Sequence, residues 1–199
     1  MSKNQQQIKK LAVNGVLAAL VCVVSFIPLR TLGLEITFSM VPVAIGACLY
    51  GPVSGAVLGL TFGFISFIQC FGYSAFGAAL LEINPILTFI VCVPTRMLAG
   101  YLAGLMFKVV NKVDKTQILS YAVTSLLAPL FNTLFFMSTL CLCFYQTETI
   151  QGFVDKLGAT NPITFVILFV GINGLVEIIC GFVVALPASK AVSKALKRR

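Results

Sequence analysis

Charge is scarce in this sequence. Only 10% of its 199 residues are charged, acidic residues number six, and histidine and tryptophan are absent. An ordinary soluble domain carries about 25% charged residues. Because 59% of the residues are hydrophobic and the mean hydropathy is +1.02, the composition excludes such a domain and predicts an integral membrane protein.

Motifs for catalysis are missing as well. The chain has no GxxxxGK[ST] phosphate-binding loop, no HExxH and no histidine to activate a serine or cysteine nucleophile. We therefore expect no enzyme, and an ATP-driven role would need ATPases in partner subunits. The seven cysteines lie in apolar stretches without a CxxC pair, so we expect small buried hydrophobes and no metal or other cofactor in this chain.

The apolar runs predict an all-α membrane protein with six transmembrane helices, forming one domain over residues 1–199. A helix that crosses the hydrocarbon needs about 20 mostly apolar residues. Gly51 and Pro52 mark a turn, since proline does not continue a helix across that position. The predicted helices span about 9–28, 36–50, 52–71, 83–107, 117–143 and 162–188.

Basic residues gather in three clusters: before the first predicted helix, after the fourth and after the sixth. With six spans, all three fall on one side, which the positive-inside rule makes cytoplasmic. The clusters are Lys3, Lys9 and Lys10; Lys108, Lys112 and Lys115; and Lys190, Lys194, Lys197, Arg198 and Arg199. Both termini are therefore predicted in the cytosol, with outer loops at 28–35, 72–81 and 145–161. Topology explains the net charge of +8 without a nucleic-acid partner.

Arg96 lies near the centre of the fourth predicted helix. A charge at that depth costs about 2.5–3.5 kcal/mol unless it faces a partner or a watery cavity. Counting about 1.5 Å per residue places Asn132 and Asn173, on the fifth and sixth helices, at the same depth, roughly 16–18 Å below the outer surface. Glu177 lies one turn beyond Asn173 on the same face. Three helices thus contribute to one polar layer.

The chemistry of this layer suits a small polar organic anion. The planar guanidinium matches a carboxylate, and the two asparagines can bind hydroxyl or amide groups. A structural alternative stays open, in which Arg96 pairs with Glu177 and the asparagines tie the helices together; the pair could also open to admit a ligand. Asn84, at the outer end of the fourth helix, and Tyr73, in an aromatic cluster that could form a lid, are further candidate ligand contacts.

Glycines recur every four residues at the start of the third predicted helix and again in the fourth. Small residues at this spacing let membrane helices approach closely, so we interpret them as packing positions and not as a ligand site. They are Gly51, Gly55, Gly59, Gly63, Gly100 and Gly104.

In these features the chain resembles the S components of energy-coupling factor (ECF) vitamin transporters. The resemblance rests on size, on topology and on the stretches 42–68, 93–108, 131–137 and 173–192. Within the family it is most similar to the pantothenate-type members. Those members share a PxR segment, an NT pair and an NGxxE segment, which here are residues 94–96, 132–133 and 173–177.

The resemblance implies capture of a vitamin at a bacterial plasma membrane and transfer to partner proteins. Arg96 would hold the carboxylate of pantothenate or a similar vitamin, Asn132 and Asn173 would bind hydroxyl or amide groups, and Glu177 would orient Arg96 or bind a hydroxyl. Outer loops one and three would close the site. In the family mechanism the loaded protein topples in the membrane, driven by a membrane coupling subunit and two cytosolic ATPases that use ATP.

Docking onto the coupling subunit is implied to use an alanine-x-x-x-alanine face on the first helix. Here Gly15 and Ala19 have that spacing, with Ala12 nearby, so glycine replaces the first alanine. Two functional alternatives remain: an S component for another vitamin such as riboflavin, folate or pyridoxine, or an ion-coupled secondary transporter in which Glu177 carries a proton. In each case the chain would be surrounded by membrane lipid.

Overall fold

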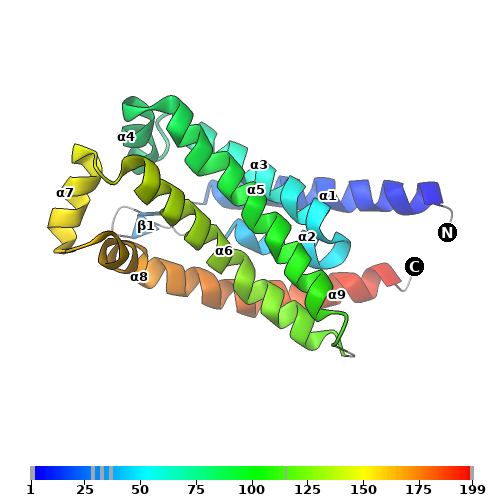
Figure 1. The fold of residues 1–199 in the computed structure, drawn as a ribbon. Coiled ribbons are helices and arrows are strands. Elements are labelled where there is room, and N and C mark those ends of the chain that lie inside the picture. The colour runs from blue at the N-terminus through cyan, green and yellow to red at the C-terminus, as the bar shows by residue number, and fades with distance from the viewer. Residues whose placement is uncertain (1–2, 28–29, 32–33, 36–37, 115, 198–199) are drawn as a thin grey trace.

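Long helices run along one main axis in the computed structural model (Figure 1). It describes residues 3–27, 30–31, 34–35, 38–114 and 116–197, without the side chains of 30–31, 34–35, 172–173, 180 and 197. The elements are α1 Lys3–Ser25, β1 Arg30–Thr31, β2 Leu34–Glu35, α2 Met40–Tyr50, α3 Pro52–Gln69, α4 Ala75–Ile83, α5 Pro85–Val110, α6 Ile118–Phe144, α7 Glu148–Leu157, α8 Pro162–Cys180, a π-helical turn Gly181–Ala185, and α9 Leu186–Lys197. Short α4 and α7 lie at one end of the bundle, and both termini lie at the other (Figure 1).

The all-α prediction is confirmed, and each of the six predicted helices has a counterpart. Among the described residues, α1, α3, α5, α6 and the segment Gly174–Leu196 are long and apolar enough to cross a membrane. The second helix begins at Met40 instead of 36, and the last continues to Lys197. Eleven residues make α2 only about 16 Å long, shorter than the hydrocarbon core of about 30 Å.

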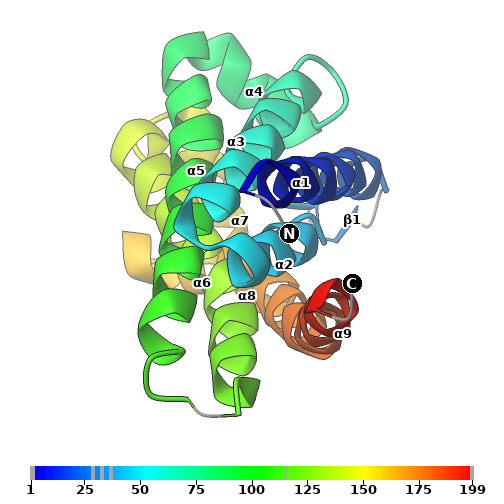
Figure 2. The same ribbon diagram turned by 90° about the vertical axis from the view of Figure 1, so that its right-hand side faces the viewer.

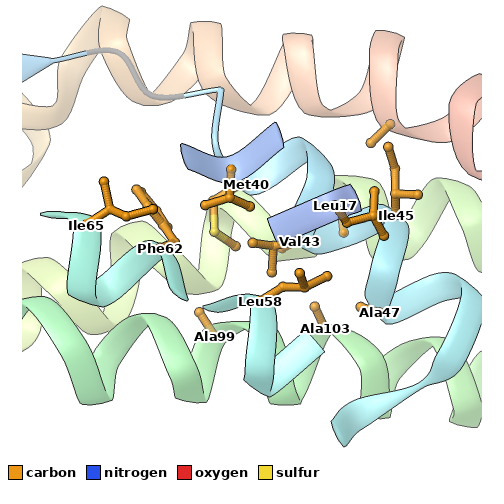
Figure 3. Packing of buried hydrophobic residues seen from close by; sticks show 14 residues of the cluster. Leu17, Met40, Val43, Ile45, Ala47, Leu58, Phe62, Ile65, Ala99 and Ala103 are labelled. Carbon is orange, nitrogen blue, oxygen red and sulfur yellow. The ribbon is translucent and has the colours of Figure 1, made fainter. Parts of the chain in front are cut away.

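Short α2 lies in the middle of the bundle, where it contacts α1, α3, α5, α6 and α9 (Figure 2). Nearly every residue of this helix is apolar and most are buried. A helix that is hydrophobic on all sides belongs in an interior. Side chains from α1, α2, α3 and α5, including Leu17, Val43, Leu58 and Ala99, form the apolar cluster around it (Figure 3).

Two of the predicted outer loops contain helices, so reading them only as loops is wrong. Ser74 caps α4, because its hydroxyl oxygen accepts a bond from Gly77 N–H, and Thr147 caps α7 in the same way. Gly158 ends α7 with a φ of 64°, in the left-handed region that glycine favours. The first outer loop contains the two short antiparallel strands β1 and β2.

The predicted glycine packing is confirmed between α3 and α5. A Cβ at Gly59 would collide with the carbonyl oxygen of Arg96, and one at Gly63 would lie 2.7 Å from Cα of Val93. Gly55 and Gly100 face each other just as closely. The backbone of α5 at Arg96 is therefore held directly against α3, which fixes where that side chain starts. Gly51 differs, since it lies in the turn before α3 with a φ of 80°.

Candidate functional site

A partly enclosed cavity of about 110 Å³ lies between α3, α4, α5, α6 and α8. A space of this size holds several water molecules, since each needs about 10–15 Å³ by this measure. Its apolar wall includes Phe76, Leu80, Phe136, Met137 and Val170, and its polar wall comprises Ser66, Gln69, Cys70, Ser74, Cys92, Arg96, Asn132, Thr133 and Glu177. Apolar walls with a few polar groups are typical of sites for small molecules.

Arg96 is buried in this wall, with 7% of its surface exposed. Its Nη1 donates a hydrogen bond to the carbonyl oxygen of Cys92 at 3.0 Å. The guanidinium carbon lies 4.7 Å from the ring centre of Phe62 and 4.8 Å from that of Phe136, which gives two cation–π contacts. Its Nε has no hydrogen-bond partner in the described part of the chain. This desolvated cation therefore has an N–H donor without a partner among the described residues, in the wall of the cavity.

Asn132 is likewise a buried polar side chain with an atom that lacks a hydrogen-bond partner among the described residues. It is also 7% exposed, and its Oδ1 has no hydrogen-bond partner among the described residues. Most buried polar groups in folded proteins are satisfied, so two unsatisfied groups in one cavity wall call for an explanation. Water or a bound ligand would supply the missing partners.

Glu177 completes the set of ionisable groups at the cavity. It lines the same space and is close enough to Arg96 to attract it electrostatically. Asn173 belongs to α8, but its side chain lies outside the described part of the chain. The helix is broken just before it, at Gly171, whose φ of 36° and ψ of −125° are not helical. Interrupted helices line substrate sites in many membrane transporters.

Two predicted ligand contacts have structural roles instead. Asn84 caps α5, where its side-chain oxygen accepts bonds from the backbone N–H groups of Ile86 and Leu87 at 3.0 and 3.1 Å. Tyr73 donates its hydroxyl to the carbonyl oxygen of Phe26 at 2.8 Å and packs its ring against that side chain. Neither residue belongs to the cavity lining. The Asn84 side-chain oxygen and the Tyr73 hydroxyl are thus bonded to backbone groups.

The second outer loop, in the form of α4, covers the cavity. Phe76 of α4 lines it and also packs against Phe153 of α7 and Phe169 of α8, with ring centres 5.7 and 5.4 Å away. The sequence-based expectation named outer loops one and three as the cover. The third loop contributes only behind Phe76, through Phe153, and the side chains of the first loop lie outside the described residues.

Several lining residues escaped the sequence analysis. Cys92 lies one helical turn before Arg96 on the same face of α5, so helical spacing could have identified it. Gln69 and Cys70 at the end of α3 carried no such signal, whereas Phe76 belongs to the aromatic cluster that the sequence offered as a lid. Their position depends on how α3 turns into α4 and how α4 packs back onto the bundle.

The predicted docking face of α1 is accessible. Ala12, Gly15 and Ala19 are all exposed, and a Cβ built on Gly15 would meet nothing within 4 Å. The neighbouring Leu11 is 75% exposed. The structure thus leaves an apolar, small-residue face of α1 open to lipid or to another helix.

Apolar helices around a cavity with buried charges are typical of membrane transport proteins. Residues 9–189 match the family described as ECF transporter, substrate-specific component, and the chain belongs to this family. This confirms the family-level prediction of a multi-pass membrane transport component, not an enzyme. Among curated proteins no match was found.

A solved structure has the same fold. It is described as the S-component for biotin from an ECF-type ABC transporter, determined at 2.1 Å. Its sequence is 16% identical to this chain, the alignment covers 100% of this chain and 95% of the solved one, and the TM-score is 0.58. At this level of identity the likeness concerns the fold.

Proposed function

We propose that this protein captures a small carboxylated vitamin for an ECF transporter, with pantothenate as the leading candidate. The observation that carries the proposal is the buried guanidinium of Arg96, whose Nε lacks a partner among the described residues at a cavity shared with the unpartnered oxygen of Asn132. A carboxylate would supply the acceptor that Arg96 lacks, and a hydroxyl or amide N–H would supply the donor that Asn132 lacks. Glu177 would orient Arg96 or accept a ligand hydroxyl.

The alternatives differ in how well they match these groups. Riboflavin and pyridoxine carry no carboxylate for Arg96, whereas folate carries two, one more than this single buried cation can pair with. Biotin, the vitamin named for the solved relative, has a carboxylate, so it is the second candidate. Pantothenate adds two hydroxyls and an amide, which suit a wall containing Ser66, Gln69, Asn132 and Thr133.

The identity of the ligand can be tested directly. The protein would be purified in mild detergent and the released small molecules analysed by mass spectrometry. Calorimetric titration with pantothenate and with biotin would follow on ligand-free protein. Binding of pantothenate with a clearly lower Kd than biotin supports the proposal, and binding of biotin alone would replace pantothenate. Binding of neither, with a different molecule copurifying, would refute both candidates.

We further propose that α1 docks onto the membrane coupling subunit through Ala12, Gly15 and Ala19, and that partner ATPases supply the energy. The exposure of these three residues supports this, because small side chains allow close helix contact. With both termini in the cytosol, the cavity end of the bundle, where α4 and α7 lie, would face outward (Figure 1). Substrate would enter past α4.

The position of Glu177 favours one alternative function, that of an ion-coupled transporter. A carboxylate beside a buried cation could carry a proton in an ion-coupled transporter that works alone. The two functions predict different energy sources. Uptake into vesicles that lack ATPases, abolished when the proton gradient is collapsed, would favour the ion-coupled transporter; uptake only with the coupling subunit, its ATPases and ATP supports the S component.

A further inference from the structure

We propose that Cys70 and Cys92 form a redox-sensitive thiol pair in the wall of the cavity, and that hydrogen peroxide converts them into a disulfide. From sequence, all seven cysteines resemble small buried hydrophobes. The structure sets these two apart, because they come from different helices and still line one cavity. Cys70 directly follows the last residue of α3, and Cys92 lies about two turns into α5.

The two side chains are in contact. Both are buried, with exposed fractions of 4% and 3%, and they share one cluster with Val93. Within the cluster, the Cys70 thiol donates a hydrogen bond to the backbone oxygen of Ser66 at 3.3 Å. A disulfide needs Cβ atoms about 3.5–4.5 Å apart, a distance that the backbones of the two segments set, and rotation about the Cα–Cβ bonds then brings the two sulfurs together.

The surroundings favour reaction. Arg96 would attract a thiolate at either cysteine, and its Nη1 donates a hydrogen bond to the backbone oxygen of Cys92 at 3.0 Å. Reactive cysteines characteristically lie beside a cation at a site that small reagents can enter. A cavity with room for several waters also has room for hydrogen peroxide.

The reaction balances without another reactant. The thiolate of Cys92, beside Arg96, attacks one oxygen of hydrogen peroxide; a sulfur–oxygen bond forms, the oxygen–oxygen bond breaks, and hydroxide leaves to become water. The thiolate of Cys70 then attacks the sulfenic sulfur, and the second hydroxide leaves as the disulfide forms. The two thiols lose two electrons and two protons, and the peroxide becomes two waters.

The new bond would tie the cover of the cavity to its wall. Cys70 directly precedes the turn into α4, and a Cβ on Gly77 of α4 would lie 2.6 Å from its sulfur. A disulfide to Cys92 would therefore hold the α3–α4 junction against α5, four residues from Arg96. We expect this restraint to impede ligand entry. That effect rests on the proposed function, whereas the disulfide itself does not.

The test uses the full-length protein, purified under reducing conditions, transferred to lipid nanodiscs and treated with hydrogen peroxide. Peptide mapping by mass spectrometry without reduction would locate any disulfide. We expect a linked Cys70–Cys92 peptide in the wild type and in a Cys141→Ser control, and none in Cys70→Ser or Cys92→Ser. Cys141 serves as the matched control because we expect it to form no disulfide. The nearest cysteine in the sequence, Cys143, lies two residues away and faces another side of α6.

The outcomes separate the thiol pair from the ligand assignment. Absence of the linked peptide, or linkage of other cysteines at equal yield, would overturn the proposal, as would sulfenic or sulfinic acid on Cys92 without a link. Pantothenate binding would then be measured before oxidation, after oxidation and after reduction with dithiothreitol. A link that forms in a protein that never binds pantothenate supports the pair and counts only against that ligand. A link with unchanged pantothenate affinity and unchanged association rate would overturn the proposed restraint.

Discussion

Replacing Arg96 by glutamine tests the proposed ligand site most directly. Glutamine keeps a donor and a long side chain but removes the positive charge and the planar fork. In the structure this side chain is 7% exposed, lies between two aromatic rings and has an unpartnered Nε among the described residues. The substitution therefore removes the one buried cation that a ligand carboxylate could meet in the described cavity wall.

The expected loss of affinity follows from the bonds at stake. A hydrogen bond to a charged group contributes about 1.5–3 kcal/mol. Since each 1.4 kcal/mol corresponds to about tenfold in Kd, Arg96→Gln should weaken pantothenate binding roughly 10- to 150-fold. Arg96→Ala should weaken it by at least as much, because it also removes the packing against Phe62 and Phe136. Lys108→Gln, in the exposed last turn of α5, should leave Kd unchanged.

Folding has to be separated from binding in this experiment. Removing one member of a fully buried opposite-charge pair costs about 3–5 kcal/mol, and we expect less here because Glu177 is only half-buried. Arg96→Gln should therefore lower the melting temperature, and the double variant Arg96→Gln/Glu177→Gln should recover part of it without recovering affinity. Calorimetry and thermal unfolding on the same samples give both numbers. Wild-type affinity in a folded Arg96→Gln protein would show that the ligand carboxylate binds elsewhere.

Three further predictions address docking, helix packing and a loop. Ala19→Leu should block assembly with the coupling subunit in a pull-down while ligand affinity stays unchanged, and normal assembly would refute docking through α1. Gly59→Ala should destabilise the fold by about 1–3 kcal/mol through overpacking between α3 and α5, whereas Gly152→Ala, with open space around it, should not. Burial raises the pKa of Asp114, but hydrogen bonds from the backbone N–H and hydroxyl of Ser120 outweigh it and lower that pKa from 3.8 to about 2. Wild type should therefore melt above Asp114→Asn at neutral pH, and the difference should shrink as the pH falls from about 4 to about 2; a constant difference would contradict this.

The sequence predicted the helices well because the signal for them is local. Long apolar runs and the Gly51–Pro52 turn require no knowledge of the fold, and counting residues from the helix ends brought Arg96 and Asn132 to one depth. In the structure they share a cavity. The same counting also proposed Asn173, whose side chain lies outside the described residues.

What the sequence did not predict depends on contacts between distant segments. The caps at Ser74 and Thr147 could have identified α4 and α7 as helices, but their packing onto the bundle places Phe76 at the cavity. The break at Gly171 had no local signal beyond the glycine itself. Asn84 shows why a helix cap and a ligand contact look alike in a sequence: both can use the side-chain amide oxygen, and in the structure this oxygen caps α5.

The charges in the cavity also restrict which ligand can bind. The negative charge of Glu177 offsets the positive charge of Arg96, so a ligand carboxylate that binds Arg96 would add a second negative charge to a poorly solvated space. Like charges at close range repel strongly there, unless Glu177 moves away, takes up a proton or accepts a hydrogen bond. A ligand that carries hydroxyls beside its carboxylate can donate that bond to Glu177 and another to Asn132. A simple fatty carboxylate cannot, and this difference favours a hydroxylated vitamin such as pantothenate over an apolar acid of the same charge.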